Sequence, residues 1–366
     1  MKIRVNLSRT VDDSYDIVIG TRLAQAAREL AREYRSRPIF VVTDSHVRNI
    51  HAVKFVDAMR SLGAACRLLV VPAGERSKSR RSKELLEDRL LRMHAGRDSL
   101  IVALGGGMIG DLAGFVAATL HRGVPYVQIP TSLLAQVDSS IGGKVAVDLP
   151  SGKNLVGAFH QPSRVYIDPA CLKTLPAREF RNGLAETIKY AMILDRGLFE
   201  LLERSRDSIG KRRKEILLSV VKRCCELKKF VVERDERERD LRRILNFGHT
   251  IGHALEHLSR FRIPHGEAVS IGMVSEARMA AALGMIPASH VRRLKALLDA
   301  YSLPTEIPAR VDPSSIIKVT SGDKKSRGGA VYYTLPTTIG RAKTGVRIPH
   351  EDAKALLMAL NGGSRA

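Results

Sequence analysis

The pattern of hydrophobic and polar positions divides the chain into two halves of different character. In the first half, short apolar runs rich in β-branched residues recur between longer helical patterns, at 39–43, 68–71, 100–104, 126–129 and 165–167. This alternation predicts a parallel sheet with helices packed on it. From about Pro176 onward, long amphipathic stretches such as 215–232 and 244–258 dominate, and only 331–335 reads as a strand. The second half is therefore expected to be mainly α-helical.

The length and composition agree with this division. A chain of 366 residues predicts two domains, and we place the boundary between Pro162 and Pro176, giving an α/β domain at 1–170 and a helical domain at 171–366. No apolar run approaches the eighteen residues of a membrane span, and the N-terminus does not read as a secretory signal. The four cysteines lack C-x-x-C spacing. A cytoplasmic protein with free thiols is expected.

The net charge of +22 adds a constraint on partners. A strongly positive field attracts polyanions or phosphorylated metabolites. Only 5% of the residues are aromatic, there is no Trp, and the basic residues are interleaved with acidic ones. These features speak against nucleic acid, although a nucleic-acid-binding protein stays an alternative at this point. A solvated basic surface is the simpler explanation of the charge.

A glycine-rich turn follows the apolar run at 100–104. Residues 105–111 read Gly-Gly-Gly-Met-Ile-Gly-Asp and lead into a helical pattern. Gly105, Gly107 and Gly110 satisfy G-x-G-x-x-G, in which the backbone can approach a pyrophosphate at a helix N-terminus. The acidic residue expected about twenty positions later is absent, so Asp44, at the end of another strand, is an alternative ribose partner. The other possibility is a tight turn without a nucleotide and a helix-capping Asp44.

A second group of polar residues predicts a metal site. Four side chains recur at helical spacing and would share one face of a helix: Arg242, Asn246, His249 and His253. His265 follows sixteen residues after His249, and Glu186 offers a carboxylate with Lys189 one turn further along. Two His and one Glu form an open catalytic zinc site. Partly buried histidines with ordinary hydrogen bonds are the alternative.

Lysines among glycines and hydroxyls form a third group. Lys144 and Lys153 lie in such segments, after the apolar run at 126–129. This setting suits a phosphorylated or carboxylated ligand, because the backbone can come close while the ammonium supplies charge. Together, a nucleotide, a metal and an anionic substrate in an interdomain cleft suggest redox chemistry on a phosphorylated polyol.

These residues, together with the segments 72–78, 159–162 and 323–325, strongly resemble the 3-dehydroquinate synthase family within the sugar-phosphate cyclases. The resemblance spans nearly the whole chain. It implies a Rossmann-like NAD-binding domain, a helical metal- and substrate-binding domain, a homodimer, NAD and one divalent metal ion, usually Zn²⁺ with Co²⁺ as the other option. The implied enzyme is a phosphorus-oxygen lyase of the shikimate pathway. It converts 3-deoxy-D-arabino-heptulosonate 7-phosphate to 3-dehydroquinate and phosphate by transient oxidation with NAD, β-elimination, re-reduction and intramolecular aldol closure.

The resemblance also implies roles for individual residues. The implied metal ligands are Glu186, His249 and His265. The implied NAD-binding residues are Asp44, Glu75, Lys78, Gly105, Gly106, Gly107, Gly110, Asp111, Thr131, Ser132, Asp138, Lys144, Lys153, Thr174 and Leu175. The implied substrate-binding and catalytic residues are Lys144, Asn154, Lys189, Lys228, Arg242, Asn246, His253, one of Lys324 and Lys325, and Arg122, which would reach across the dimer to the phosphate.

Three residues differ from the family pattern. They affect detailed contacts with the cofactor, and none of them is an implied ligand of the metal or the substrate. They are Val145 in place of a common Thr, His46 in place of Asn, and Asp240 in place of Gly.

Two enzyme classes remain as rivals. Sister cyclases act on sugar phosphates without a carboxylate, and would not need the clamp that Arg242 and Lys228 offer. A metal-dependent alcohol or glycerol dehydrogenase of related architecture would release NADH.

Overall fold

The chain forms two units, and each is described by itself. The first comprises Met1–Ile129 and Gly143–Ile167, and the second comprises Pro130–Gly142 and Asp168–Ala366. The computed structural model describes residue 4 and residues 12–321, 326–327 and 329–362. The segment Pro130–Gly142 belongs to the second unit although it precedes the boundary expected near residue 170.

A six-stranded sheet forms the centre of the first unit, with the order β1-β8-β5-β4-β2-β3. Its strands are β1 (Asp16–Ile19), β2 (Ile39–Asp44), β3 (Cys66–Val71), β4 (Leu100–Gly105), β5 (Tyr126–Pro130) and β8 (Arg164–Ile167). The pairs β1–β8, β2–β3, β2–β4 and β5–β8 run parallel. The five apolar runs predict β2, β3, β4, β5 and β8, and these predictions are confirmed. The short edge strand β1 is not among these predictions, although its Ile-Val-Ile sequence is also a short apolar run.

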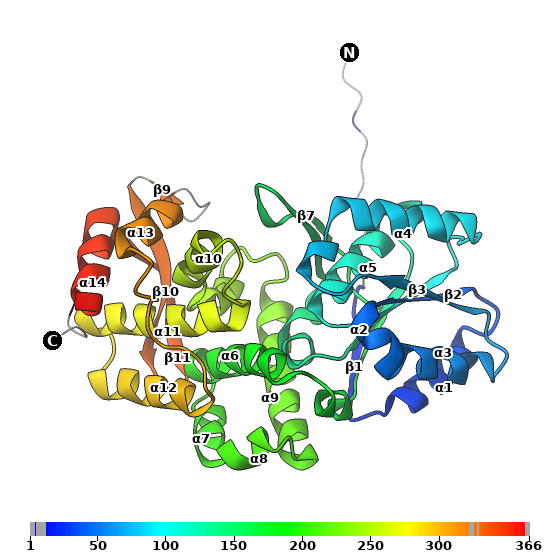
Figure 1. Cartoon of the computed structure of the whole chain (residues 1–366), viewed down its shortest axis with the longest axis horizontal. Helices are drawn as coiled ribbons and strands as arrows, with labels where there is room; N and C mark the ends of the chain where they lie inside the picture. Colours follow the sequence, from blue (N-terminus) through cyan, green and yellow to red (C-terminus); the bar gives the residue numbers. More distant parts are fainter. Residues whose placement is uncertain (1–3, 5–11, 322–325, 328, 363–366) are drawn as a thin grey trace. The chain divides into compact units, whose positions relative to one another are not determined.

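Helices cover both faces of this sheet (Figure 1). On one face, α1 (Leu23–Glu33) and α3 (Val53–Arg60) share a core with Val41. On the other, α4 (Arg80–Arg92) and α5 (Gly107–Thr119) share a core with Val42. Successive strand side chains point to opposite faces, so a strand covered on both sides must be apolar throughout. This is why the central strands read as continuous apolar runs. The shorter helices of this unit are α2 (Ser45–Val47), η1 (Arg48–Ala52), η2 (Glu75–Ser77) and η3 (Leu120–Arg122).

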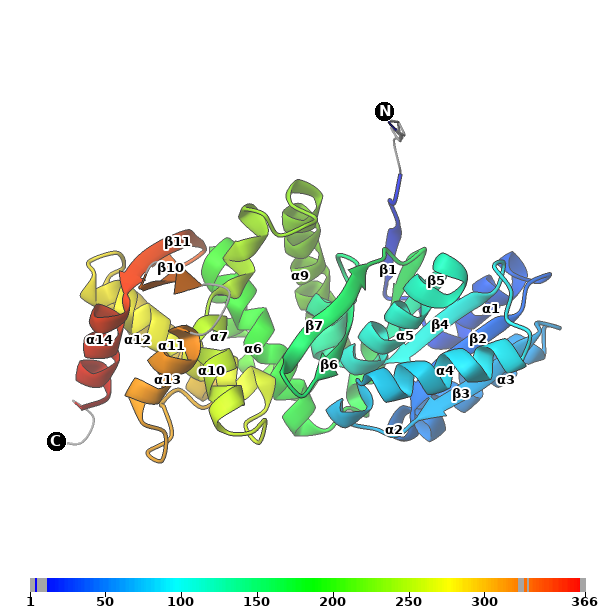
Figure 2. The same ribbon diagram turned by 90° about the horizontal axis from the view of Figure 1, so that it is seen from above.

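An antiparallel hairpin of β6 (Lys144–Leu149) and β7 (Gly152–Phe159) lies against α5 (Figure 2). Val145 and Val147 of β6 enter the same core as α5, whereas Leu155 and Phe159 of β7 are exposed. Lys144 and Lys153, which are predicted to contact an anionic ligand, therefore lie on this hairpin.

The second unit consists mainly of helices, as predicted. They are η4 (Ala135–Ser139), η5 (Pro169–Lys173), α6 (Ala177–Leu194), α7 (Arg196–Arg204), α8 (Arg206–Gly210), α9 (Lys214–Arg234), η6 (Leu241–Asn246), α10 (His249–Leu258), α11 (His265–Ala282), α12 (Ala288–Ala300), α13 (Pro313–Ser321) and α14 (His350–Gly362). Most residues of α6 and α11 are buried, so these two helices form the core of the unit. No helix among the described residues is long and apolar enough to cross a membrane.

The strand predicted at 331–335 is confirmed as part of β10, but the expectation that no other strand occurs in the second half is wrong. A three-stranded antiparallel sheet contains β9 (Ser326–Arg327), β10 (Ala330–Thr338) and β11 (Arg341–Pro349). The strand β11 lies at the sheet edge and alternates exposed with partly buried positions. It therefore has no apolar run that the sequence pattern could reveal.

The prediction of one continuous helix over 244–258 is also wrong. The 3₁₀ helix η6 ends at Asn246, and α10 begins at His249. Between them Gly248 has φ +78°, and a Cβ there would lie 2.5 Å from Cγ of Met273. The left-handed backbone and the close packing both require glycine. Consequently Arg242 and Asn246 do not continue the helical face that carries His249 and His253.

Candidate active site

A fully buried carboxylate lies at the centre of the second unit. Glu186 is in the middle of α6 and is 0% exposed. Neither of its carboxylate oxygens has a hydrogen-bond partner within the described residues. Lys189, one helical turn along, forms an ion pair with it. An ionised carboxylate in this position costs free energy unless cations compensate it, so the site favours a cation.

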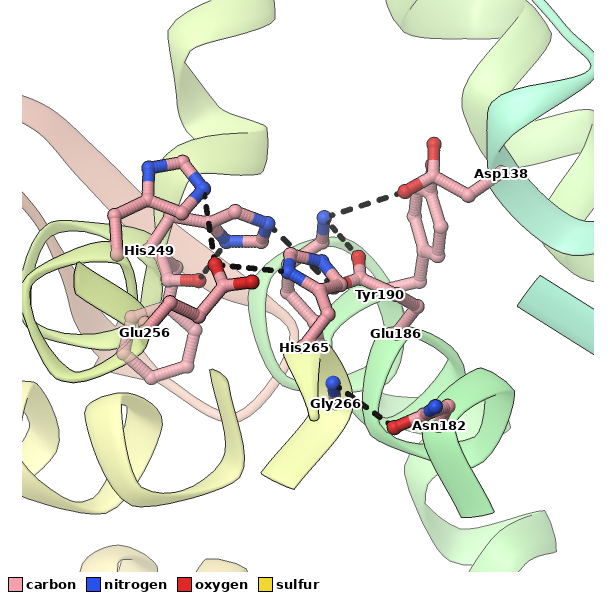
Figure 3. A network of polar contacts seen from close by, with 12 residues as sticks. Asp138, Asn182, Glu186, Tyr190, His249, Glu256, His265 and Gly266 are labelled. Carbon is pink, nitrogen blue, oxygen red and sulfur yellow. Dashed lines mark hydrogen bonds and ion pairs between the residues drawn. The ribbon is translucent and has the colours of Figure 1, made fainter. Parts of the chain in front are cut away.

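Two histidine rings turn their Nε2 atoms towards this carboxylate (Figure 3). The distance to Glu186 Oε1 is 3.5 Å from His249 Nε2 and 3.4 Å from His265 Nε2. The three ligand atoms lie within 4.8 Å of one another. On the far side of each ring, His249 Nδ1 lies 3.1 Å from Phe247 O, and His265 Nδ1 lies 3.3 Å from Glu256 Oε2. These contacts hold a proton on each Nδ1, so that Nε2 is the nitrogen through which each ring can bind a metal.

The protein moves the pKa values of the two histidines in opposite directions. Burial, helped by the positive charge of Lys189, holds the pKa of His249 well below its usual value. Burial also disfavours charge on His265, but the neighbouring carboxylates of Glu186 and Glu256 outweigh it and raise the pKa of that imidazole to about 10. The neutral His249 suits a metal ligand directly. The proton of His265 is held where a metal ion can take its place.

Glu256 and His253 lie next to the group formed by Glu186, His249 and His265. Glu256 on α10 is buried, and its Oε2 lies 4.0 Å from Nε2 of the exposed His253. His253, Glu256 and His265 form a second group of ligand atoms within 4.8 Å of one another. His253 is predicted to face the substrate, whereas the sequence motifs do not single out Glu256. No sequence signal distinguishes it from an exposed glutamate on a helix, and only its burial reveals it.

A second charged cluster forms around Asp138 of η4. Lys228 of α9 pairs with this carboxylate, Lys189 Nζ lies 3.6 Å from Oδ2, and the Tyr190 hydroxyl donates a hydrogen bond of 3.0 Å to Oδ1. Burial opposes the charge of Asp138, but the two ammonium groups outweigh it and hold the pKa of the carboxyl well below its usual value. The structure therefore joins Asp138, predicted for NAD, to two lysines predicted for the substrate.

Arg242 is 2% exposed, and part of its guanidinium is bound to the backbone. Nη1 donates to Glu236 O at 2.5 Å, and Nη2 donates to Gly142 O at 3.1 Å. Asn246 Nδ2 donates to Glu238 Oε1 at 2.9 Å. These contacts fix the direction of both side chains although no continuous helix connects them to His249.

The predicted nucleotide-binding residues of the first unit gather at the carboxyl edge of the sheet. The strands β2 and β4 end at Asp44 and Gly105, and parallel neighbours end at the same edge. Asp44 Oδ1 accepts hydrogen bonds from the backbone N–H of His46 and Val47, so this side chain caps α2. In the turn, a Cβ at Gly105 would lie 2.7 Å from Ile109 and a Cβ at Gly110 2.6 Å from Gln128.

Lys78 links three of the predicted residues at this edge. Its Nζ lies 2.5 Å from Asp111 Oδ2, 2.5 Å from Asn154 Oδ1 and 4.0 Å from Glu75 Oε1. Burial opposes the charge of Lys78, but Asp111 and Glu75 outweigh it and raise the pKa of the ammonium. Asn154 has φ +57° on β7. The structure thus brings a residue predicted for the substrate next to three predicted for NAD.

The remaining predicted residues are spread over both units. Lys144 and Lys153 lie on the β6–β7 hairpin, and Arg122 is exposed in η3 with φ +68°. Thr131 and Ser132 begin the segment Pro130–Gly142, and Thr174 and Leu175 follow η5. Gly107 is the first residue of α5, and Gly106 is its N-cap. Lys324 and Lys325 lie outside the described residues.

Comparison with known proteins decides the family. The model of the 3-dehydroquinate synthase N-terminal domain matches residues 68–182, and that of the C-terminal domain matches residues 183–326. The chain belongs to the 3-dehydroquinate synthase family. A 3-dehydroquinate synthase from Thermodesulfovibrio yellowstonii is 42% identical over 97% of this chain and 99% of its own length. Another from Pelobacter propionicus is 46% identical over 92% of this chain and 94% of its own length.

Solved structures confirm the fold class. The 2-epi-5-epi-valiolone synthase from Streptomyces hygroscopicus subsp. jinggangensis, with NAD⁺ and Zn²⁺ bound, is 30% identical and has a TM-score of 0.90, covering 99% of this chain and 100% of its own. A 2-deoxy-scyllo-inosose synthase complexed with carbaglucose-6-phosphate, NAD⁺ and Co²⁺ is 28% identical with a TM-score of 0.84, covering 93% and 95%. The predicted function, a 3-dehydroquinate synthase of the shikimate pathway, is confirmed by the family.

Proposed function

We propose that Glu186, His249 and His265 hold the divalent ion of a 3-dehydroquinate synthase and that the first unit holds its NAD. The observation that carries the metal assignment is the fully buried Glu186 carboxylate, which pairs with Lys189 on its own helix and faces two histidine Nε2 atoms. Two His and one Glu are the ligands of open catalytic zinc sites, which leave room for substrate oxygens. The NAD assignment rests on the glycine turn before α5 and on the residues around Lys78.

We propose the cations around Asp138 as the binding site for the anionic substrate, 3-deoxy-D-arabino-heptulosonate 7-phosphate. Lys189, Lys228 and Arg242 are buried, and only part of their charge is compensated by Asp138 and Glu186. Buried cations of this kind bind carboxylate and phosphate more strongly than exposed ones. Burial and the neighbouring Arg242 lower the pKa of Lys228, and Asp138 opposes this effect.

Individual residues of the chain then have distinct roles in the reaction. When bound, the two cofactors supply reversible oxidation of the C5 hydroxyl and polarisation of its oxygen. Lys189, Lys228 and Arg242 orient the substrate and neutralise its charges, and Asp138 holds the two lysines in place. His253, exposed beside Glu256, is the group that can exchange a proton with substrate. Ring opening and aldol closure need mainly orientation from these side chains.

We further propose the two units as the NAD-binding domain and the metal- and substrate-binding domain, and a homodimer as the assembly. Arg122, exposed in η3, would contact the substrate phosphate of the partner subunit. Sedimentation velocity tests the assembly, and a monomer at assay concentration would contradict it.

The experiment that tests the proposed function follows phosphate release from the heptulosonate phosphate, with and without NAD and a chelator. We expect release to require both cofactors, and no NADH absorbance to accumulate, because the hydride returns to the product within each turnover. Stoichiometric accumulation of NADH during steady turnover would instead indicate a dehydrogenase.

The structural likeness to a sister cyclase calls for one control in this assay. The solved 2-epi-5-epi-valiolone synthase matches with a TM-score of 0.90. Its sequence identity of 30% is lower than the 42–46% of the 3-dehydroquinate synthases. Parallel assays with sugar phosphates that lack the carboxylate separate the two. Preference for those substrates would support the sister activity.

A further inference from the structure

The helices α10 and α11 carry the two histidine ligands and cross in backbone contact. A Cβ at Gly272 of α11 would lie 2.0 Å from Gly248 O, and one at Gly252 of α10 would lie 3.2 Å from the backbone of Ala268. His249 is the first residue of α10, and His265 is the first residue of α11. The geometry between the two rings therefore depends on how these helices are held together.

A buried carboxylate of α10 reaches the histidine of α11. Glu256 Oε2 lies 3.3 Å from His265 Nδ1, on the side of the ring opposite to Glu186 (Figure 3). A carboxylate on the distal nitrogen of a metal-binding histidine fixes the tautomer and the ring orientation and makes the other nitrogen a stronger donor. Glu256 meets this description without being a ligand of the Glu186 group itself.

A buried carboxylate of α11 reaches the start of α10. Glu276 is 0% exposed and accepts hydrogen bonds from Gly248 N at 2.6 Å and from Ile251 N at 3.2 Å. These N–H groups flank His249 and belong to the helix end that lacks intrahelical partners. The negative charge also suits the positive end of the helix dipole. Glu276 thus fixes the backbone that carries His249.

We infer that Glu256 and Glu276 are positioning residues that form a reciprocal brace, in which each carboxylate belongs to one helix and holds the histidine-bearing end of the other. The inference rests on the proposed metal site. The brace holds His249 and His265 in their binding geometry before the ion binds. Binding of the ion therefore has to order these ligands only a little further.

The test measures zinc affinity by competition with a chromophoric chelator, on folded apo-protein at 25 °C. We expect Glu256→Gln and Glu276→Gln each to weaken binding about 10- to 100-fold. The two N–H groups donate to different oxygens of Glu276, and Glu276→Gln turns one of these oxygens into an NH₂ donor, so one N–H group loses its acceptor. Glu256→Gln keeps an acceptor but loses the charge. The matched control is Ser275→Ala, because Ser275 is buried on α11, next to Glu276, and its hydroxyl donates to Ile271 O within the same helix. Its zinc affinity should equal that of the wild type.

A second measurement separates positioning from general stabilisation. A merely structural carboxylate would lower the unfolding midpoint of the apo-protein and leave the zinc affinity of the folded variant unchanged, which would overturn the inference. Co²⁺-loaded variants should also show shifted d–d bands, since the donor geometry changes. If a Gln variant does not fold, the corresponding Asp variant, which keeps the charge, is measured. Failure of the Asp variants to fold would likewise overturn a positioning role.

The wild-type protein distinguishes this inference from the proposed function. Absence of zinc binding in the wild type would overturn the metal site and the brace together. Tight zinc binding in the wild type with unchanged affinity in both Gln variants would overturn the brace alone.

Discussion

The charge of Glu186 lies where water cannot compensate it, and this determines what its neighbours must supply. Lys189 provides one positive charge on the same helix, but Asp138 competes for that ammonium. A divalent ion between the carboxylate and the two imidazoles would complete the balance. The loss of a single ligand should therefore be felt mainly in metal binding.

For His265→Ala we expect loss of the bound ion together with loss of phosphate release, because only two protein ligands remain. Metal analysis of the purified variant by atomic emission checks this result. The control is His257→Ala, since His257 is exposed on α10. Full metal stoichiometry in His265→Ala would contradict the assignment.

For Arg242→Ala we expect kcat/KM for the heptulosonate phosphate to fall about 30- to 1000-fold, as when one partner of a buried charged pair is truncated. Substrates without the carboxylate should lose far less, and metal content should stay near that of the wild type. The loss of the bonds to Gly142 O and Glu236 O should also lower the free energy of unfolding by about 1–3 kcal/mol. Equal kinetic losses on both substrate types would show that Arg242 is purely structural.

The cysteines should be unreactive in the folded protein. All four are buried and free. Burial raises the pKa of the Cys66 thiol to about 11 and that of Cys171 to about 12, from an ordinary value of 9.0. Folding therefore favours the neutral thiol, and this contribution to stability is fully present below pH 9 and is lost as the pH rises towards 11–12. A thiol-reactive dye at pH 8 should label the protein only after unfolding in guanidinium; rapid labelling of the native state would contradict the prediction.

The sequence alone singles out the proposed metal ligands better than the residues that support them. His249, His265 and Glu186 belong to residue types and spacings with few structural uses, so they can be singled out. Glu256 and Glu276 read as ordinary helix positions, because a buried carboxylate differs from an exposed one only through its tertiary contacts. The contacts of Arg242 with backbone carbonyls are equally invisible, since carbonyls carry no sequence signature.

At the scale of the elements, the crossing of α10 and α11 should tolerate no added side chain. For Gly272→Ala we expect a loss of at least about 1–3 kcal/mol in the free energy of unfolding, because the new Cβ would collide with the backbone at Gly248. Zinc affinity should fall as well, since the helices must move apart. Guanidinium denaturation checks the first effect. Gly210→Ala is the control, because a Cβ there meets nothing within 4 Å, and a similar loss in both variants would contradict the prediction.

Elements are predictable from sequence where burial imposes a pattern. The strands β2 and β4 are covered on both faces and read as apolar runs, whereas β11 is an edge strand and has no apolar run. The break before α10 is hidden for another reason. Gly248 is compatible with a continuous helix on spacing alone, and only its packing against Met273 and Gly272 reveals why the helix stops there.

At the scale of the whole molecule, the path of the chain has a consequence for dividing the protein. The second unit includes Pro130–Gly142, a segment inserted between two parts of the first. Gln136 of this segment donates hydrogen bonds to Pro130 O and Asp168 O, next to the two points where the chain changes unit. Its Asp138 and Gly142 also bond to Lys228 and Arg242.

No single cut can therefore separate the two units as autonomous halves. A fragment of residues 168–366 would keep two buried lysines and Arg242 but lose the carboxylate and carbonyl that satisfy them. We expect it to be unfolded by circular dichroism and to gain helical signal when a peptide of residues 130–142 is added. A fragment that is cooperatively folded on its own would contradict this. The enzyme is thus expected to fold only as a whole. A fusion, truncation or recombination event should keep both units folded or unfold both.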